Sequence, residues 1–122
     1  MKTRYEDVEP YVTKDGSEIR ELMHPAVHGV GRNLSLAEAR IPPGGETKLH
    51  RHLKSEEIYH VLEGKGLMRL GNEEFEIVTG DTILIPPGTP HNVRNIGAGV
   101  LRLLCACAPP YSHEDTELLV GE

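Results

Sequence analysis

Two histidines separated by one residue, His50 and His52, have the clearest potential for chemistry in this sequence. If the segment Lys48–His52 is a strand, both imidazoles leave the same face, because side chains alternate along a strand. Glu57 follows five residues later, and a bend over residues 53–56 would return its carboxylate to that face. Two imidazoles and a carboxylate hold a transition metal while leaving coordination positions open. An HxH pair also occurs by chance, so the spacing alone does not separate a metal site from a surface pair.

A third histidine, His91, comes directly after the segment Pro86–Pro90. Three of the five residues in this segment are prolines, whose rings fix φ and stiffen the backbone. A stiff approach aims the next side chain reproducibly, as a metal ligand requires. His91 is therefore a further candidate ligand.

The glycines and prolines around these histidines form two long gapped patterns. The first runs from Gly44 over five residues to His50-x-His52, then over four to Glu57 and over six to Gly64. The second runs from Gly80 over five residues to Pro86-x-Gly88, then over two to His91 and over three to Asn95. In this order they resemble the two motifs of the cupin superfamily. Each motif is present once, so the chain resembles a small single-domain member, a monocupin.

The resemblance implies an all-β fold, a double-stranded β-helix or jelly-roll barrel. It also implies one divalent transition metal ion per chain (Mn, Fe, Co, Ni, Cu or Zn), held by His50, His52, Glu57 and His91. Glu56 is an alternative carboxylate, since the spacing before the glutamate varies within the family, but only Glu57 keeps six residues to the following glycine. The glycines of the two motifs and Asn95 would supply turns.

The elements that must position these ligands are short strands. The chain has 13 glycines and 9 prolines among 122 residues, and brief runs of strand-forming residues alternate with turn signals from Asn33 to Ala108. This spacing is typical of a sandwich or barrel. We expect one domain over residues 1–122, with its core barrel at about 33–108. The predicted strands are Leu34–Ile41, Lys48–His52, Glu57–Leu62, Gly66–Leu70, Glu74–Val78, Thr82–Ile85, Asn92–Asn95 and Val100–Cys107.

The two ends of the chain and the cysteines are less clearly patterned. Residues Ser17–Met23 suit either a capped helical turn or an edge strand, and we favour the strand. Ser112 could cap a short helix over His113–Leu119, with acidic residues in its first turn. Cys105 and Cys107 would share one face of a strand about 6.6 Å apart, near the limit for a disulfide. We therefore predict buried free thiols.

Strand alternation from Glu57 places Tyr59 on the ligand face, where it could hydrogen-bond a substrate or shuttle a proton. It is the candidate catalytic residue. His60 would point outward with Ile58 and Leu62, and this apolar stripe predicts a homodimer that covers it. Further residues have weaker assignments. Four arginines could each clamp an anion: Arg40, Arg69, Arg94 and Arg102, with Arg69 expected in solvent and Arg102 at the rim or in the pocket. Three histidines are predicted on the surface: His24, His28 and His113. Tyr111 is predicted to pack the tail onto the barrel.

Composition excludes several classes of partner. The net charge is −6 and the basic residues are scattered, so nucleic acid is not an expected partner. No apolar run approaches the roughly 18 residues that a bilayer span needs, and no apolar segment follows the first charges, so we expect neither a membrane anchor nor a secretory signal. The cytoplasm is the expected compartment. An eight-stranded barrel has room for one small ligand, so a small molecule is the expected partner.

A divalent ion with three neutral imidazoles and one carboxylate leaves a charge of about +1 at the pocket floor. This favours a small anionic or oxygen-rich molecule, with the metal as Lewis acid or electron relay. We expect a metal-dependent enzyme, either an oxidoreductase of the dioxygenase type or a sugar or keto-acid isomerase. The alternative is a non-catalytic, metal-containing module that binds a sugar or effector. The fold alone names no reaction.

Overall fold

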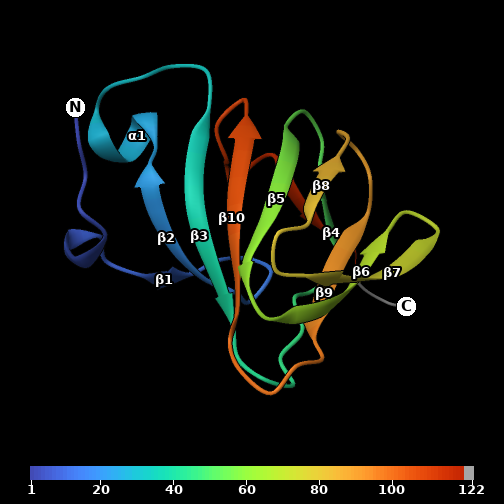
Figure 1. The fold of residues 1–122 in the computed structure, drawn as a ribbon. Coiled ribbons are helices and arrows are strands. Elements are labelled where there is room, and N and C mark those ends of the chain that lie inside the picture. The colour runs from blue at the N-terminus through green and yellow to red at the C-terminus, as the bar shows by residue number, and fades with distance from the viewer. Residues whose placement is uncertain (120–122) are drawn as a thin grey trace.

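The protein folds as two antiparallel sheets that face one another, seen in a computed structural model that describes residues 1–119 (Figure 1). One sheet has the strand order β1-β2-β3-β10-β5-β8 and the other the order β11-β4-β9-β6-β7. The strands are β1 (Tyr11–Val12), β2 (Glu18–Met23), β3 (Ser35–Ile41), β4 (His50–His52), β5 (Glu56–Glu63), β6 (Lys65–Leu70), β7 (Glu73–Val78), β8 (Thr82–Ile85), β9 (His91–Asn95), β10 (Leu101–Ala108) and β11 (Thr116–Leu118). A 3-10 turn, η1 (Tyr5–Asp7), and a one-turn helix, α1 (Pro25–His28), precede β3.

Alternation of buried and exposed residues explains how the sheets pack. In β10, Leu101, Leu103, Cys105 and Cys107 are buried, whereas the residues between them are half-buried on the other face. The same period of two in β5 and β6 directs one side of each strand into the space between the sheets. The core consists of these inward side chains, and Met68, Val61 and Leu101 have no exposed surface. This is the all-β jelly-roll expected from the sequence.

Gly64 carries the chain from one sheet to the other, between β5 and β6. Its φ is +101°, in a region that residues with a side chain rarely adopt. A Cβ at this position would lie 2.7 Å from the carbonyl oxygen of Val100 and 2.9 Å from the Cα of Leu101. Glycine is therefore required here by both conformation and space.

The predicted strands all form, with ends that match or shift by at most two residues, and residues 18–23 form the strand β2 that we favoured there. Both cysteines are buried and free, as predicted. The prediction of a C-terminal helix over His113–Leu119 is wrong. Ser112 caps only a single turn, accepting from the backbone N–H of Asp115, and residues 116–118 then form β11 against β4. The pairing of β11 satisfies an edge of β4 that a helix would leave open.

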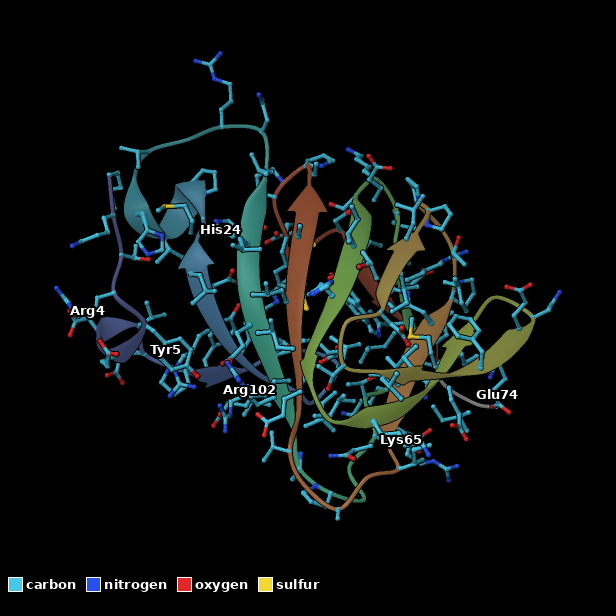
Figure 2. All side chains as sticks on the ribbon, viewed as in Figure 1. Arg4, Tyr5, His24, Lys65, Glu74 and Arg102 are labelled. Carbon is cyan, nitrogen blue, oxygen red and sulfur yellow. The ribbon has the colours of Figure 1, made fainter. Side chains whose placement is uncertain are left out.

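The outer face of the six-stranded sheet carries a buried carboxylate. Glu38 is 1% exposed, and the Tyr5 hydroxyl donates to its Oε1 at 2.6 Å. Arg102 Nε donates to Oε2 at 2.8 Å, and Arg20 and Arg40 approach within 3.8 Å. Tyr5 and Arg102 lie toward the left of Figure 2. The N-terminal turn η1 is thus held on this outer face, on the opposite side of the sheet from the inward side chains. Within residues 1–119, no helix is long and apolar enough to span a membrane.

Candidate metal centre

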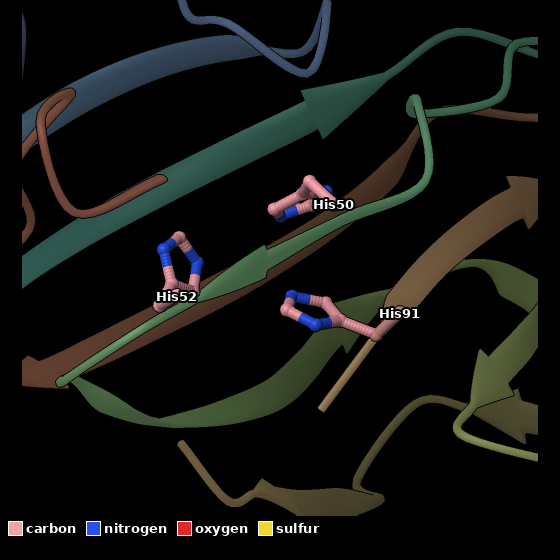
Figure 3. Close-up of side chains that lie close together, drawn as sticks. All are labelled: His50, His52 and His91. Carbon is pink, nitrogen blue, oxygen red and sulfur yellow. The ribbon is translucent and has the colours of Figure 1, made fainter. Parts of the chain in front are cut away.

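Three histidines from two neighbouring strands converge between the sheets. His50 and His52 lie on β4, and His91 begins β9, where it is the register partner of His50. One ring nitrogen of each lies within 4.8 Å of the others, and all three side chains are buried (Figure 3). The His50 and His91 ring centroids are 4.2 Å apart. The i, i+2 spacing and the proline-rich approach therefore bring these residues together as expected.

Backbone carbonyls fix which nitrogen of each ring faces the centre. His50 Nδ1 lies 2.7 Å from the carbonyl oxygen of Lys48, and His91 Nδ1 lies 2.9 Å from that of Thr89. A carbonyl oxygen can only accept, so each Nδ1 carries the hydrogen. Each Nε2 then presents a bare lone pair toward the other rings. This is the orientation in which a neutral imidazole binds a metal.

His52 is oriented in the same way by a threonine on β11. Its Nδ1 lies 3.0 Å from Thr116 Oγ1, and that hydroxyl donates to the carbonyl oxygen of Ser112 at 2.8 Å. With its hydrogen used there, the hydroxyl accepts from His52 Nδ1, which leaves the Nε2 lone pair free. Thr116 was missed in the sequence because its segment was assigned to a helix.

Glu57 lies beside two of the histidines, with its Oε1 near the free nitrogens of His52 and His91. The Oε1 atom is 3.1 Å from His52 Nε2 and 3.5 Å from His91 Nε2. Glu57 Oε1 and His91 Nε2 are both buried, and neither has a hydrogen-bond partner. Acceptors that face one another without a donor are costly in a protein interior. A cation among them removes this cost, so the donor set fits a divalent transition metal.

Burial keeps His50 suited to this role. Burial lowers the pKa of His50 to about 4. His50 is therefore neutral at physiological pH, as a metal ligand must be. Burial and the negative charge of Glu57 raise the pKa of Tyr59 well above its usual value, so its hydroxyl stays protonated.

An aspartate that the sequence analysis did not single out also reaches this centre. Asp15 lies in the turn between β1 and β2, and its Oδ2 is 3.7 Å from His50 Nε2. Its Oδ1 accepts from the Thr13 and Ser17 hydroxyls, each at 2.7 Å, and from the Ser17 backbone N–H at 2.9 Å. The turn is tied to the C-terminal segment by Lys14, whose Nζ donates to the carbonyl oxygens of His113 and Thr116. A local Thr-x-Asp-x-Ser turn was visible in the sequence, but its position beside His50 was not.

His50, His52 and Glu57 form part of the wall of a small cavity of about 40 Å³, enough for a few water molecules, and His91 is not among its lining residues. Tyr59 lies on this wall with Glu57, as strand alternation predicted, and Tyr111 joins it from the C-terminal segment. Two further carboxylates, Asp15 and Glu21, also line it. The remaining lining residues are Thr13, Ser17, Ile19, Ser35, Ala37, Ala39, Ile41, Thr47, Val93, Leu103, Cys105 and Cys107.

None of the candidate arginines reaches the cavity. Arg40 and Arg102 lie on the outer face of the sheet with Glu38. Arg102 alternates with the inward Leu101 and Leu103 on β10, and Arg40 alternates with the inward Ala39 and Ile41 on β3. The prediction for Arg102, rim or pocket, is therefore wrong. Arg69 is exposed, as expected, and so is Arg94.

The remaining histidines lie away from the centre. His60 is on the outer face of β5, where its Nδ1 lies 2.8 Å from Thr82 Oγ1. His113 is exposed and His28 half-buried. The surface assignment of His24 is wrong, since this residue is 9% exposed. Its Nδ1 accepts from the backbone N–H of Ala26 at the start of α1, and its Nε2 lies 2.7 Å from the carbonyl oxygen of Tyr111.

Comparison with known families agrees with this geometry. The sequence model of the cupin domain family matches residues 37–107, more than half of the chain. The protein belongs to the cupin family. The match spans β3 to β10 and includes all four candidate ligands.

Individual relatives extend the comparison. An uncharacterized protein of Methanocaldococcus jannaschii is 59% identical, covering 98% of this cupin and 94% of the relative. The oxalate-binding protein of Thermotoga maritima is 31% identical, covering 68% of this chain and 67% of that protein. Among solved structures, the oxalate decarboxylase of Lactobacillus farciminis has a TM-score of 0.82 and 26% identity over 95% of this cupin. This cupin spans only 35% of the decarboxylase, about a third of its length.

The Thr116 hydroxyl gives a test of the ligand geometry in this cupin. Thr116→Val keeps the shape of the side chain but removes the acceptor for His52 Nδ1. Loss of such a supporting hydrogen bond is expected to lower metal affinity roughly 10- to 100-fold. Competition against a chromogenic chelator measures the change. Thr82→Val is the matched control, because it removes the equivalent contact to the non-ligand His60. Equal affinities for the two variants would contradict the role assigned to Thr116.

Proposed function

We propose that this cupin is a metal-dependent enzyme that acts on a small oxygen-rich molecule. The observation that carries the proposal is the convergence of the buried ring nitrogens of His50, His52 and His91, with the unpartnered Glu57 Oε1 beside His52 and His91. His50, His52, Glu57 and His91 would hold one divalent transition metal ion. When bound, such an ion acts as a Lewis acid or electron relay toward substrate oxygens at its open positions.

The chain itself supplies the remaining parts of the site. The carbonyls of Lys48 and Thr89 and the hydroxyl of Thr116 hold the rings in the binding orientation. Tyr59 is 4% exposed, and its protonated hydroxyl would donate a hydrogen bond to a substrate oxygen. The apolar lining, including Ile41, limits the access of water to the substrate. Tyr59 is thus the proposed catalytic residue.

The similarity to an oxalate decarboxylase supports an enzyme in this family, and either oxygen-dependent oxidation or isomerisation of a sugar or keto acid suits the site. The 31%-identical oxalate-binding protein favours a second candidate, a module that binds a small ligand at the metal without turnover.

Metal analysis followed by an assay of turnover separates these candidates. Protein made without an affinity tag or added metal should contain about one transition metal ion per chain. Oxygen uptake with a panel of diketones, catechols and keto acids would assign the dioxygenase type, and conversion without oxygen uptake would assign an isomerase. Tight ligand binding with no conversion of any panel member would favour the binding module. Protein that takes up no metal would contradict both.

We also propose a homodimer in the cytoplasm. Leu36, Ile58 and Leu84 are 36%, 41% and 54% exposed, and with Ala106 they form one register row across β3, β10, β5 and β8. Such an apolar row is suited to a two-fold interface. The two free thiols fit a reducing compartment. Light scattering at micromolar concentration should give the mass of two chains, and Ile58→Lys that of one. A monomeric unsubstituted protein would contradict the dimer.

A further inference from the structure

We infer that the cavity selects a neutral, hydroxyl-bearing molecule and rejects anions, an inference that rests on the proposed metal-dependent function and narrows its substrate class. The charge at the four ligands alone favours an anion. Two additional carboxylates in the wall reverse that preference.

Glu21 is the first of these carboxylates. It lies on the inward face of β2 and is 6% exposed. Its Oε2 accepts from the Tyr11 hydroxyl at 2.6 Å, but its Oε1 is buried without any hydrogen-bond partner. A buried carboxylate oxygen without a donor is costly. Because Glu21 lines the cavity, a hydroxyl group of a bound molecule can supply that donor.

Asp15 is the second. Three donors from its own turn occupy Oδ1, which leaves Oδ2 facing His50 Nε2 at 3.7 Å. The turn is held in place, since the backbone N–H of Lys48 donates to the Asp15 carbonyl oxygen at 2.8 Å. Oδ2 is thus positioned in advance to accept a hydrogen bond from a molecule bound at the metal.

No basic side chain offsets these charges. The lining residues among positions 1–119 include no lysine or arginine, and Arg20, Arg40 and Arg102 are engaged with Glu38 on the outer face. A divalent ion (+2) with the carboxylates of Glu57, Asp15 and Glu21 (−3) gives −1. An anionic ligand would add a further negative charge to this small, enclosed site and is therefore repelled. A neutral hydroxycarbonyl molecule can instead bind the ion through its oxygens. Its O–H groups can donate to the two free carboxylate oxygens, Glu21 Oε1 and Asp15 Oδ2.

Two isosteric probes, neutral glycolamide and anionic glycolate, test this selection in metal-loaded protein, with oxalate as a doubly charged third probe. Titration calorimetry should show the highest affinity for glycolamide, a lower affinity for glycolate and the lowest for oxalate. Glu21→Gln and Asp15→Asn remove one charge with little change of shape. Each should raise the affinity for glycolate relative to glycolamide by roughly tenfold or more. Glu74→Gln is the matched control, because Glu74 is exposed on β7, at the far right in Figure 2.

The outcomes distinguish the inference from the function on which it rests. The proposed selection would be overturned if metal-loaded protein bound oxalate most tightly. It would also be overturned if the preference for glycolamide over glycolate were the same in Glu21→Gln, Asp15→Asn and Glu74→Gln. Either result would leave the metal site intact. Protein that binds no metal would overturn the proposed function, and the selection with it. Thermal unfolding of each variant verifies folding.

Discussion

His52→Ala protein is expected to retain no metal ion, whereas His60→Ala protein should retain about one per chain. His52 Nε2 is one of the three free lone pairs at the centre, and its removal leaves an open, hydrated position. His60 differs by lying on the outer face of β5, where it contacts Thr82 and no ligand. Metal content measured after gel filtration without added metal compares the two directly.

Thermal unfolding provides a second measure of the same substitution. A metal that binds only the folded state stabilises it by about 3 kcal/mol when present at a hundred times its dissociation constant. Chelation should therefore lower the Tm of the unsubstituted protein and leave that of His52→Ala unchanged. Full metal occupancy in His52→Ala, or a turnover that survives the substitution, would contradict the assigned site.

Gly64→Ala should produce the largest loss of stability. The substitution forces a side chain onto a backbone with φ of +101° and brings its Cβ within 2.7 Å of the Val100 carbonyl oxygen. Strain at such a φ costs about 1–3 kcal/mol by itself. Because the clash is with backbone, it cannot be relieved by rotation of a side chain, and the total loss in the free energy of unfolding should exceed about 4 kcal/mol. Urea denaturation monitored by circular dichroism gives this value.

Gly80→Ala separates the two contributions. Gly80 has a similar φ of +97°, but a Cβ there would meet nothing within 4 Å. This variant should lose only the strain of about 1–3 kcal/mol. Equal losses for the two variants would show that the close approach of β5–β6 to Val100 is not the reason for glycine at position 64.

The grouping of the three histidines was predictable from local spacing for His50 and His52 and from the motif resemblance for His91. His50 and His52 need only strand alternation to share a face, and the glycines and prolines around them mark the turns that bring Glu57 and His91 back. The inward position of Tyr59 and the outward position of His60 followed from the same period of two.

Residues that depend on long-range contacts were not predictable in this way. Asp15 and Glu21 reach the cavity from the N-terminal strands, and Thr116 reaches His52 across 64 residues of sequence. Thr116 was also hidden by helix-like signals after Ser112, which tertiary pairing of β11 with β4 overrides. Arg102 has no local signal for its partner, because Glu38 lies 64 residues away on a neighbouring strand.

Anomalous diffraction from crystals of the metal-loaded protein tests the central claim most directly. We predict one peak per chain, bounded by the Nε2 atoms of His50, His52 and His91 and by an oxygen of Glu57, each at about 2.0–2.2 Å as transition metals require. A peak elsewhere in the molecule, or a His91 ring turned away from the ion, would contradict the account.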